Sequence, residues 1–167
     1  MIRLATPRDA DLLFPLAHEG IAATYGGDLS RDAFVEAWLS GRAGYCILDD
    51  TGYTNQEDER IPAAFICGAL VKGRLNASVW LMPRDMPGMM GEGLYAASFA
   101  EGLRRWPTVT ECFATFVTDN QIERGVQQRY ALRLRDVPTF RTIEKERTVE
   151  NVCSAAALAA FFGVARA

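Results

Sequence analysis

The stretch Pro87-Gly88-Met89-Met90-Gly91-Glu92-Gly93 runs straight into a helical pattern that extends from Leu94 to Trp106. An apolar segment, Ala77 to Met82, precedes it, so the expected order is strand, glycine loop and helix. That order brings free backbone N–H groups and the positive end of a helix dipole to one point, which suits an anion such as phosphate. An ordinary tight turn, with methionines filling the core, is the other interpretation of the same residues.

The composition is that of one folded domain. The chain has 167 residues, of which 49% are hydrophobic and 23% charged, and this is enough to bury a substantial core. A net charge of -3 lacks the overall positive charge that is typical of proteins that bind nucleic acid or anionic lipid. The residues after Met1 lack the apolar core of a signal peptide, and no segment has the apolar length of a membrane span. We therefore expect a cytoplasmic protein without membrane or nucleic-acid partners.

The cysteines and the histidine limit the available chemistry. Four cysteines are scattered without a C-x-x-C pair, so we expect buried free thiols in a reducing compartment. The chain has one histidine, His18, which leaves little for a His-rich metal site or a Ser-His-Asp triad. No metal is predicted.

Helix signals dominate the first forty residues. Residues 2–5 are predicted to form a short strand, and Thr6, Pro7 and Asp9 then match an N-cap, a first helical residue and the acidic partner of a capping box. Ser30 is expected to cap a second, shorter helix, which Gly41 ends.

A sheet is predicted from the apolar runs that follow. Strands are expected at Tyr45–Leu48, Ile61–Val71 and Ala77–Met82. The polar segment 49–60 fits a solvated hairpin loop, and the Lys72–Asn76 stretch fits a turn between two antiparallel strands.

The chain beyond Trp106 is predicted to alternate between strands and helices. The expected elements are a strand at Glu111–Val117, a polar helix at Gln121–Leu132, a strand at Val137–Lys145 and an amphipathic helix from Val149 to Phe161. We divide the chain into residues 1–147 and a C-terminal helix, 148–167, that packs on the same unit or on a second copy. The order βααβββαβαβα predicts an α/β (α+β) domain whose mixed, mostly antiparallel sheet is flanked by helices.

Three of these stretches resemble the GNAT family of acetyl-CoA-dependent N-acyltransferases. The opening Ile2-Arg-Leu-Ala-Thr-Pro-Arg-Asp is similar to the family's first strand and helix start. The strand Ala77–Met82 and the loop Gly88-x-x-Gly91-x-Gly93 resemble its cofactor motif, Arg/Gln-x-x-Gly-x-Gly/Ala. Val117-Thr118-Asp119-Asn120 resembles the later segment in which an Asn opens a helix. The likeness covers residues 1–145 in the order of elements.

The resemblance implies an acetyl-CoA site around the glycine loop. Backbone amides at the helix start would hold the pyrophosphate, and the end of the preceding strand would lie beside the pantetheine arm. The residues implied are Leu81, Met82, Gly88, Met89, Met90, Gly91, Glu92, Gly93, Leu94 and Asn120. Two of them depart from the family pattern, since Gly88 replaces Arg or Gln and Glu92 adds a negative charge.

The implied reaction is direct attack of an amine on the acetyl thioester in a ternary complex, which needs no covalent nucleophile. The acceptor would be a primary amine of a small molecule or of a protein terminus. Glu111 is the candidate base, and Tyr130 is the candidate acid for the departing thiolate. The alternative is an inactive GNAT-like scaffold that serves as a binding or assembly module, which the two loop departures favour.

Overall fold

The computed structural model of the protein describes residues 1–25, 28–50, 53–54, 60–61, 64–79, 92–117, 136–146 and 148–165. Its centre is a seven-stranded sheet in which β6 and β7 are parallel and all other neighbours are antiparallel. This mixed, mostly antiparallel sheet confirms the predicted fold class. In spatial order its strands are β1 (Ile2–Leu4), β2 (Gly44–Asp49), β5 (Ala64–Val71), β6 (Arg74–Val79), β7 (Glu111–Val117), β9 (Thr148–Ser154) and β8 (Arg141–Glu144).

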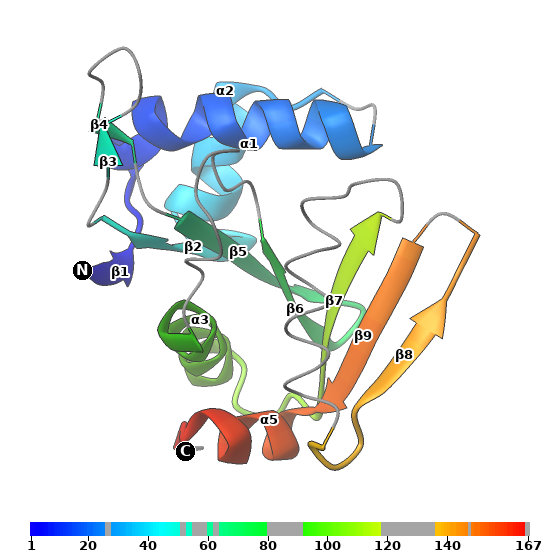
Figure 1. The fold of residues 1–167 in the computed structure, drawn as a ribbon. Coiled ribbons are helices and arrows are strands. Elements are labelled where there is room, and N and C mark those ends of the chain that lie inside the picture. The colour runs from blue at the N-terminus through cyan, green and yellow to red at the C-terminus, as the bar shows by residue number, and fades with distance from the viewer. Residues whose placement is uncertain are drawn as a thin grey trace.

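Helices cover both faces of the sheet and enclose two cores (Figure 1). The helices α1 (Ala10–Tyr25) and α2 (Arg31–Phe34) cover the β1, β2 and β5 end on one face, over a core that contains Leu13, Phe34 and Phe65. The helices α3 (Glu92–Arg105) and α5 (Ala155–Phe162) lie on the other face. Their core joins Leu103 and Leu158 to the inner side chains of the sheet. The C-terminal helix therefore packs on the domain's own core.

The predicted helix starts in the first forty residues agree with the structure. The Thr6 backbone N–H donates to Asp9 Oδ2 at 2.8 Å, which is the carboxylate half of a capping box, and a short 3-10 turn, Pro7–Asp9, leads into α1. The Ala33 backbone N–H donates to Ser30 Oγ at 3.1 Å at the start of α2. A π-helical turn, Val35–Leu39, completes this second helix before Ser40.

The hairpin between β5 and β6 is tighter than predicted. Only Lys72 and Gly73 form the turn, with φ values of 50° and 77°, and Val71 pairs directly with Arg74. Positive φ at both central residues is typical of a type I′ turn, which suits a two-residue hairpin. The residues 74–76 assigned to a turn from sequence are therefore strand. Two short paired strands, β3 (Tyr53–Thr54) and β4 (Arg60–Ile61), also form. β3 lies within the predicted loop 49–60, and Ile61, predicted as the start of the next strand, belongs to β4 instead of β5.

The predicted C-terminal helix is wrong over its first half. Residues 148–154 form β9, which lies between β7 and β8 and pairs with both, and the helix begins only at Ala155. Tertiary pairing on two sides overrides the three- and four-residue apolar spacing here, and Val149 and Val152 are β-branched residues that suit a strand. The Ala157 backbone N–H donates to Ser154 Oγ at 3.1 Å, so Ser154 caps the helix. The predicted strand Val137–Lys145 shortens to β8.

Candidate functional site

The crossover from β6 through α3 to β7 is the part of the fold that positions the candidate site (Figure 1). The strands β6 and β7 are parallel neighbours, so α3 must run antiparallel to both of them. Its first residue, Glu92, therefore lies at the end of the sheet where β6 finishes at Val79. The predicted strand and the predicted helix are confirmed in this order, and the predicted glycine loop between them lies outside the described residues.

The two strands of this crossover part soon after they meet. Within the described part of the chain, the register pairs that join them are Leu75 with Cys112 and Asn76 with Phe113. Beyond these pairs β6 continues for three residues as a partner of β5, and β7 continues for four residues as a partner of β9. Figure 1 shows the strands running apart toward their C-terminal ends. An extended molecule can bind beside such an edge by hydrogen-bonding its backbone, as an added strand does.

A buried tyrosine fixes α3 against the sheet. The Tyr45 side chain is 1% exposed, and its hydroxyl donates to the Ser98 carbonyl oxygen at 2.5 Å. Two glycines make room for this contact: a Cβ on Gly68 would lie 2.2 Å from Tyr45 Cζ, and a Cβ on Gly102 would lie 2.9 Å from the Tyr45 hydroxyl oxygen. Burial raises the pKa of the Tyr45 phenol above its ordinary value, so the hydroxyl stays a donor at neutral pH.

A carboxylate holds the C-terminal end of α3. Glu101 is 9% exposed and accepts hydrogen bonds from Arg104 Nε at 2.8 Å and from Arg105 Nε at 2.5 Å. Hydrogen bonds from Arg104 hold the pKa of the Glu101 carboxyl below its ordinary value. Arg105 Nη1 also donates to the Gly44 carbonyl oxygen at 3.1 Å, which links the helix to β2. The helix that starts at the candidate site is thus anchored at both its middle and its end.

Few of the predicted cofactor-binding residues fall within the described chain. The backbone of Glu92, Gly93 and Leu94 forms the first turn of α3, where the N–H groups have no partner inside the helix. The Leu94 side chain is 3% exposed and belongs to the core, so at this position only the backbone can meet a ligand. The other seven predicted contacts lie outside the described residues: Leu81, Met82, Gly88, Met89, Met90, Gly91 and Asn120.

The candidate base Glu111 is placed away from the diverging ends of the strands. It is the first residue of β7, two positions before Phe113, on the side where β6 and β7 are joined. Its carboxylate accepts from Arg74 Nη1 at 3.2 Å and from Arg141 Nη2 at 3.3 Å. This geometry favours an ion pair that ties neighbouring strands together over the catalytic role expected from sequence. The candidate acid Tyr130 lies outside the described residues.

A second carboxylate, which was not predicted from the sequence, belongs to the same network. Glu150 on β9 is 5% exposed and accepts from Arg74 Nη1 at 2.7 Å and from Lys145 Nζ at 3.3 Å. Hydrogen bonding from Arg74 holds the pKa of the Glu150 carboxyl below its ordinary value. The Arg74 guanidinium also lies 4.1 Å from the centroid of the Phe113 ring. No sequence signal marked Glu150, because residues 149–161 were assigned to a helix.

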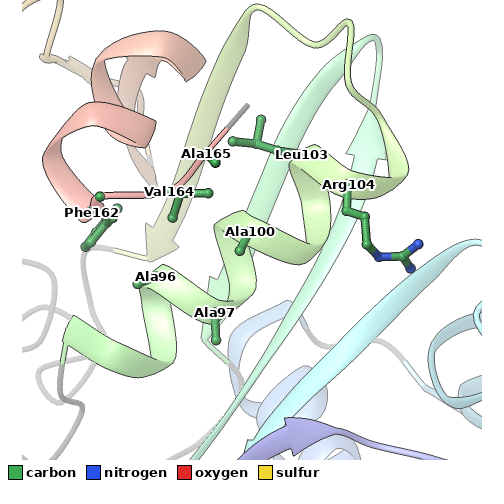
Figure 2. Close-up of a pocket in the computed structure, with 9 residues that line it drawn as sticks. Ala96, Ala97, Ala100, Leu103, Arg104, Phe162, Val164 and Ala165 are labelled. Atoms are coloured by element: carbon green, nitrogen blue, oxygen red, sulfur yellow. The ribbon is translucent and has the colours of Figure 1, made fainter. Parts of the chain in front are cut away.

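A groove of about 500 Å³ lies between α3 and the C-terminal segment (Figure 2). Ala96, Ala97 and Ala100 of α3 line one side, and Val164 and Ala165 line the other. The cation in its lining is Arg104, whose Nη2 donates to Glu101 at 2.7 Å. An apolar lining with an already paired guanidinium does not have the chemistry of a pyrophosphate site.

The described residues contain no group of three or more His, Cys, Asp or Glu side chains placed to hold a metal ion. Within the same residues, no helix is both long and apolar enough to cross a membrane.

No protein-family model matches the chain, and no curated protein matches it by sequence. Solved structures match it by fold. The chain is similar to a ribosomal-protein-alanine N-acetyltransferase from Brucella melitensis, with a TM-score of 0.62 and 13% identity over 92% of this chain and 99% of that one.

Two further structures carry the cofactor or its product. The PaiA N-acetyltransferase from Thermoplasma acidophilum in complex with coenzyme A has a TM-score of 0.57 and 15% identity, over 92% of this chain and 98% of that one. A GNAT superfamily phosphinothricin acetyltransferase from Sinorhizobium meliloti in complex with acetyl-CoA has a TM-score of 0.62 and 10% identity, over 92% of this chain and 87% of that one. Identities this low establish the fold alone, and it is the fold of the GNAT acetyltransferases.

Proposed function

We propose that this chain, which has the GNAT acetyltransferase fold, is itself a cytoplasmic N-acetyltransferase that moves an acetyl group from acetyl-CoA to a primary amine. One observation carries the proposal: β6 and β7 separate after two register pairs, next to the N-terminal end of the helix that joins them. The two solved structures with bound coenzyme A or acetyl-CoA share this fold over more than nine-tenths of the present chain.

The chain would hold the pyrophosphate and the pantetheine arm of acetyl-CoA in different ways. The N–H groups in the first turn of α3, which lack partners inside the helix, would hold the pyrophosphate together with the positive end of the helix dipole. The glycines from Gly88 to Gly91 precede that turn and would let the backbone approach the phosphate oxygens. The inner edges of β6 and β7 would bind the pantetheine arm, with Leu81 and Met82 following β6 in the sequence after Trp80.

In the proposed reaction, acetyl-CoA would supply a thioester that a neutral amine attacks directly in a ternary complex. The protein then has to orient the amine, exclude water and remove one proton from it. Glu111 is not assigned the proton-removing role. Two arginines bind its carboxylate, and it lies at the end of β7 that is joined to β6, away from the ends where the two strands separate. Tyr130 keeps its place in the proposal as the acid for the leaving thiolate.

For the acceptor we propose a chemical class, a primary amine, and no individual compound. A primary amine on a small molecule or at a protein terminus can attack the thioester in the same way, and the similar structures include a phosphinothricin acetyltransferase and a ribosomal-protein-alanine N-acetyltransferase.

An inactive scaffold is the second candidate, and the position of Glu92 favours it. Glu92 is the first residue of α3, so the segment that would meet the pyrophosphate contains an acidic residue type. At about 4 Å and an effective dielectric constant near 20, two unit charges of the same sign repel by about 4 kcal/mol. A repulsion of that size can abolish binding of a ligand that only the loop and the strand edges hold.

Isothermal titration with coenzyme A separates the two candidates. An acetyltransferase should bind coenzyme A and, with acetyl-CoA and a panel of amines, release free thiol at a rate that depends on the amine. Absence of binding at millimolar coenzyme A contradicts the proposal. Binding without turnover for any amine in the panel supports the scaffold.

Two variants test where the binding takes place. Gly91→Glu adds a side chain and a negative charge to the loop and should abolish binding, whereas Glu92→Gln removes a charge and should tighten it by about fivefold or more. Ala156→Glu is the matched control, because it adds the same charge to the first turn of α5 at an exposed position. If Gly91→Glu binds as well as the control, the ligand does not bind at this loop.

A further inference from the structure

The four cysteines of the chain form two cross-strand pairs. Cys46 on β2 lies directly opposite Cys67 on β5, and Cys112 on β7 lies directly opposite Cys153 on β9. All four thiols are buried, with exposed fractions of 3% or less. Residue type, strand orientation and burial are therefore matched between the pairs. Their position in the hydrogen-bonding pattern of the sheet differs.

The pair Cys46 and Cys67 occupies a narrow position. The Cys46 carbonyl oxygen accepts from the Ala5 backbone N–H at 2.8 Å, and the Asp50 backbone N–H donates to the Met1 carbonyl oxygen at 2.9 Å. The backbone groups of the even-numbered residues of β2 therefore point toward β1 and away from β5. Opposed residues whose backbones do not bond each other have Cα atoms only about 4.5 Å apart, with side chains closer than in bonded pairs.

The pair Cys112 and Cys153 occupies a wide position. The Ala155 backbone N–H donates to the Thr110 carbonyl oxygen at 2.8 Å, two residues along from this pair in the register. The backbones of Cys112 and Cys153 therefore face each other as a hydrogen-bonded pair, with Cα atoms about 5.5 Å apart. The Cys153 thiol is also held elsewhere, because Sγ lies 3.7 Å from Thr139 Oγ1 and donates to the Pro138 carbonyl oxygen at 3.6 Å.

The sulfur atoms reflect this difference. Cys67 Sγ donates to Cys46 Sγ at 3.6 Å in the core beneath α1 and α2. We propose that Cys46 and Cys67 are a disulfide site, which a small hydroperoxide closes to lock β2 to β5, and that Cys112 and Cys153 do not close under the same conditions.

The roles of the two thiols follow from their hydrogen bond. Cys67 donates its S–H to Cys46 Sγ, so the Cys67 sulfur already faces the Cys46 sulfur that it attacks in the second step. Burial raises the pKa of the Cys67 thiol well above its ordinary value, which keeps its proton in place until the second step. Cys46 is therefore the attacking thiol and Cys67 the resolving thiol.

The reaction balances in two steps. Cys46 sulfur attacks hydrogen peroxide, the O–O bond breaks, and the departing hydroxide takes the thiol proton as water, which leaves a sulfenic acid on Cys46. Cys67 sulfur then attacks Cys46 sulfur, the S–O bond breaks, and the hydroxide leaves with the Cys67 proton as a second water. Two thiols lose two electrons in all, and one peroxide is reduced to two waters.

Peptide mapping of the whole protein tests this proposal. Reduced protein is treated with hydrogen peroxide, unfolded in denaturant that contains iodoacetamide, and digested. The masses of its peptides are then measured by mass spectrometry. We expect a cross-linked peptide that joins Cys46 to Cys67 and is lighter by two hydrogen atoms, with Cys112 and Cys153 alkylated. A bridge between Cys112 and Cys153, four alkylated thiols, or sulfinic acid on Cys46 without a bridge would each overturn it.

Two serine variants sharpen the assignment. Cys67→Ser should lose the bridge and leave a sulfenic acid on Cys46 that dimedone labels, whereas Cys153→Ser should form the bridge at the wild-type rate. A loss of the bridge in Cys153→Ser contradicts the proposal. If Cys67→Ser does not fold, the melting temperature of the wild-type protein replaces it: peroxide should raise the melting temperature by several degrees, and dithiothreitol should reverse the rise. An unchanged melting temperature contradicts the proposal.

Discussion

Substituting Gly68 by Ala should loosen α3 from the sheet, because Gly68 lies under the tyrosine that holds this helix. A Cβ at this position would lie 2.2 Å from Tyr45 Cζ and 2.3 Å from the Tyr45 hydroxyl oxygen. The aromatic ring is rigid and 1% exposed, so it has to move as a whole. Its movement breaks the hydrogen bond from the hydroxyl to the Ser98 carbonyl oxygen.

The expected loss of stability has two parts. Overpacking a core costs roughly 1–3 kcal/mol. Losing a buried hydrogen bond adds about 1 kcal/mol. Gly68→Ala should therefore lower the free energy of unfolding by about 2–4 kcal/mol, and with a urea slope near 2 kcal/mol per molar the unfolding midpoint should fall by about 1–2 M.

Two controls separate these parts. Gly73→Ala changes the same residue type in an open turn, where no atom lies within 4 Å of the new Cβ, and should cost only about 1–2 kcal/mol of backbone strain at its φ of 77°. Tyr45→Phe keeps the ring and removes the hydroxyl, and should cost about 1 kcal/mol. A Gly68→Ala protein that unfolds within about 0.5 kcal/mol of wild type would refute the packing argument.

Three further predictions concern the carboxylates and the C-terminal helix. The hydrogen bond from Arg74 lowers the pKa of Glu150, so its stabilisation is complete above the unfolded pKa of about 4.3 and is lost as pH falls through the folded value. Glu150→Gln should thus cost roughly 1–3 kcal/mol in urea unfolding at pH 7 and much less near pH 3, and an equal cost at both pH values argues against the ion pair. Glu111→Gln should keep most of the coenzyme A affinity and any acetyl-transfer rate, and a rate loss of a hundredfold or more with intact binding would restore its role as base. Ser154→Ala should cost about 1 kcal/mol by removing the cap of α5, and no change would argue against a helix start at Ala155.

Local signals in the sequence predicted much of the first half of the fold. The caps at Thr6 and Ser30 depend on residues three positions away, so the sequence alone was enough to place them. The same holds for the crossover helix, whose apolar spacing and following Pro107 lie within one segment. The order of elements that suggested the GNAT fold came from these local features.

Long-range pairing explains what the sequence did not predict. The segment 148–154 became a strand because β7 and β8 pair with it on both sides, and its own apolar spacing also fits a helix. The partners of Glu111 depend on register, since Arg74 and Arg141 lie 37 and 30 residues away in the chain. The separation of β6 from β7 depends on how two pairs of strands twist, which no single stretch encodes.

Hydrogen exchange with and without coenzyme A shows where on the fold the ligand binds, and so tests the proposed site itself. We expect coenzyme A to slow backbone exchange at the ends of β6 and β7 and in the first turn of α3, and to leave exchange unchanged in β1 and in the groove between α3 and the C-terminal segment. Slower exchange confined to the groove, or no change at any peptide at saturating coenzyme A, would contradict it.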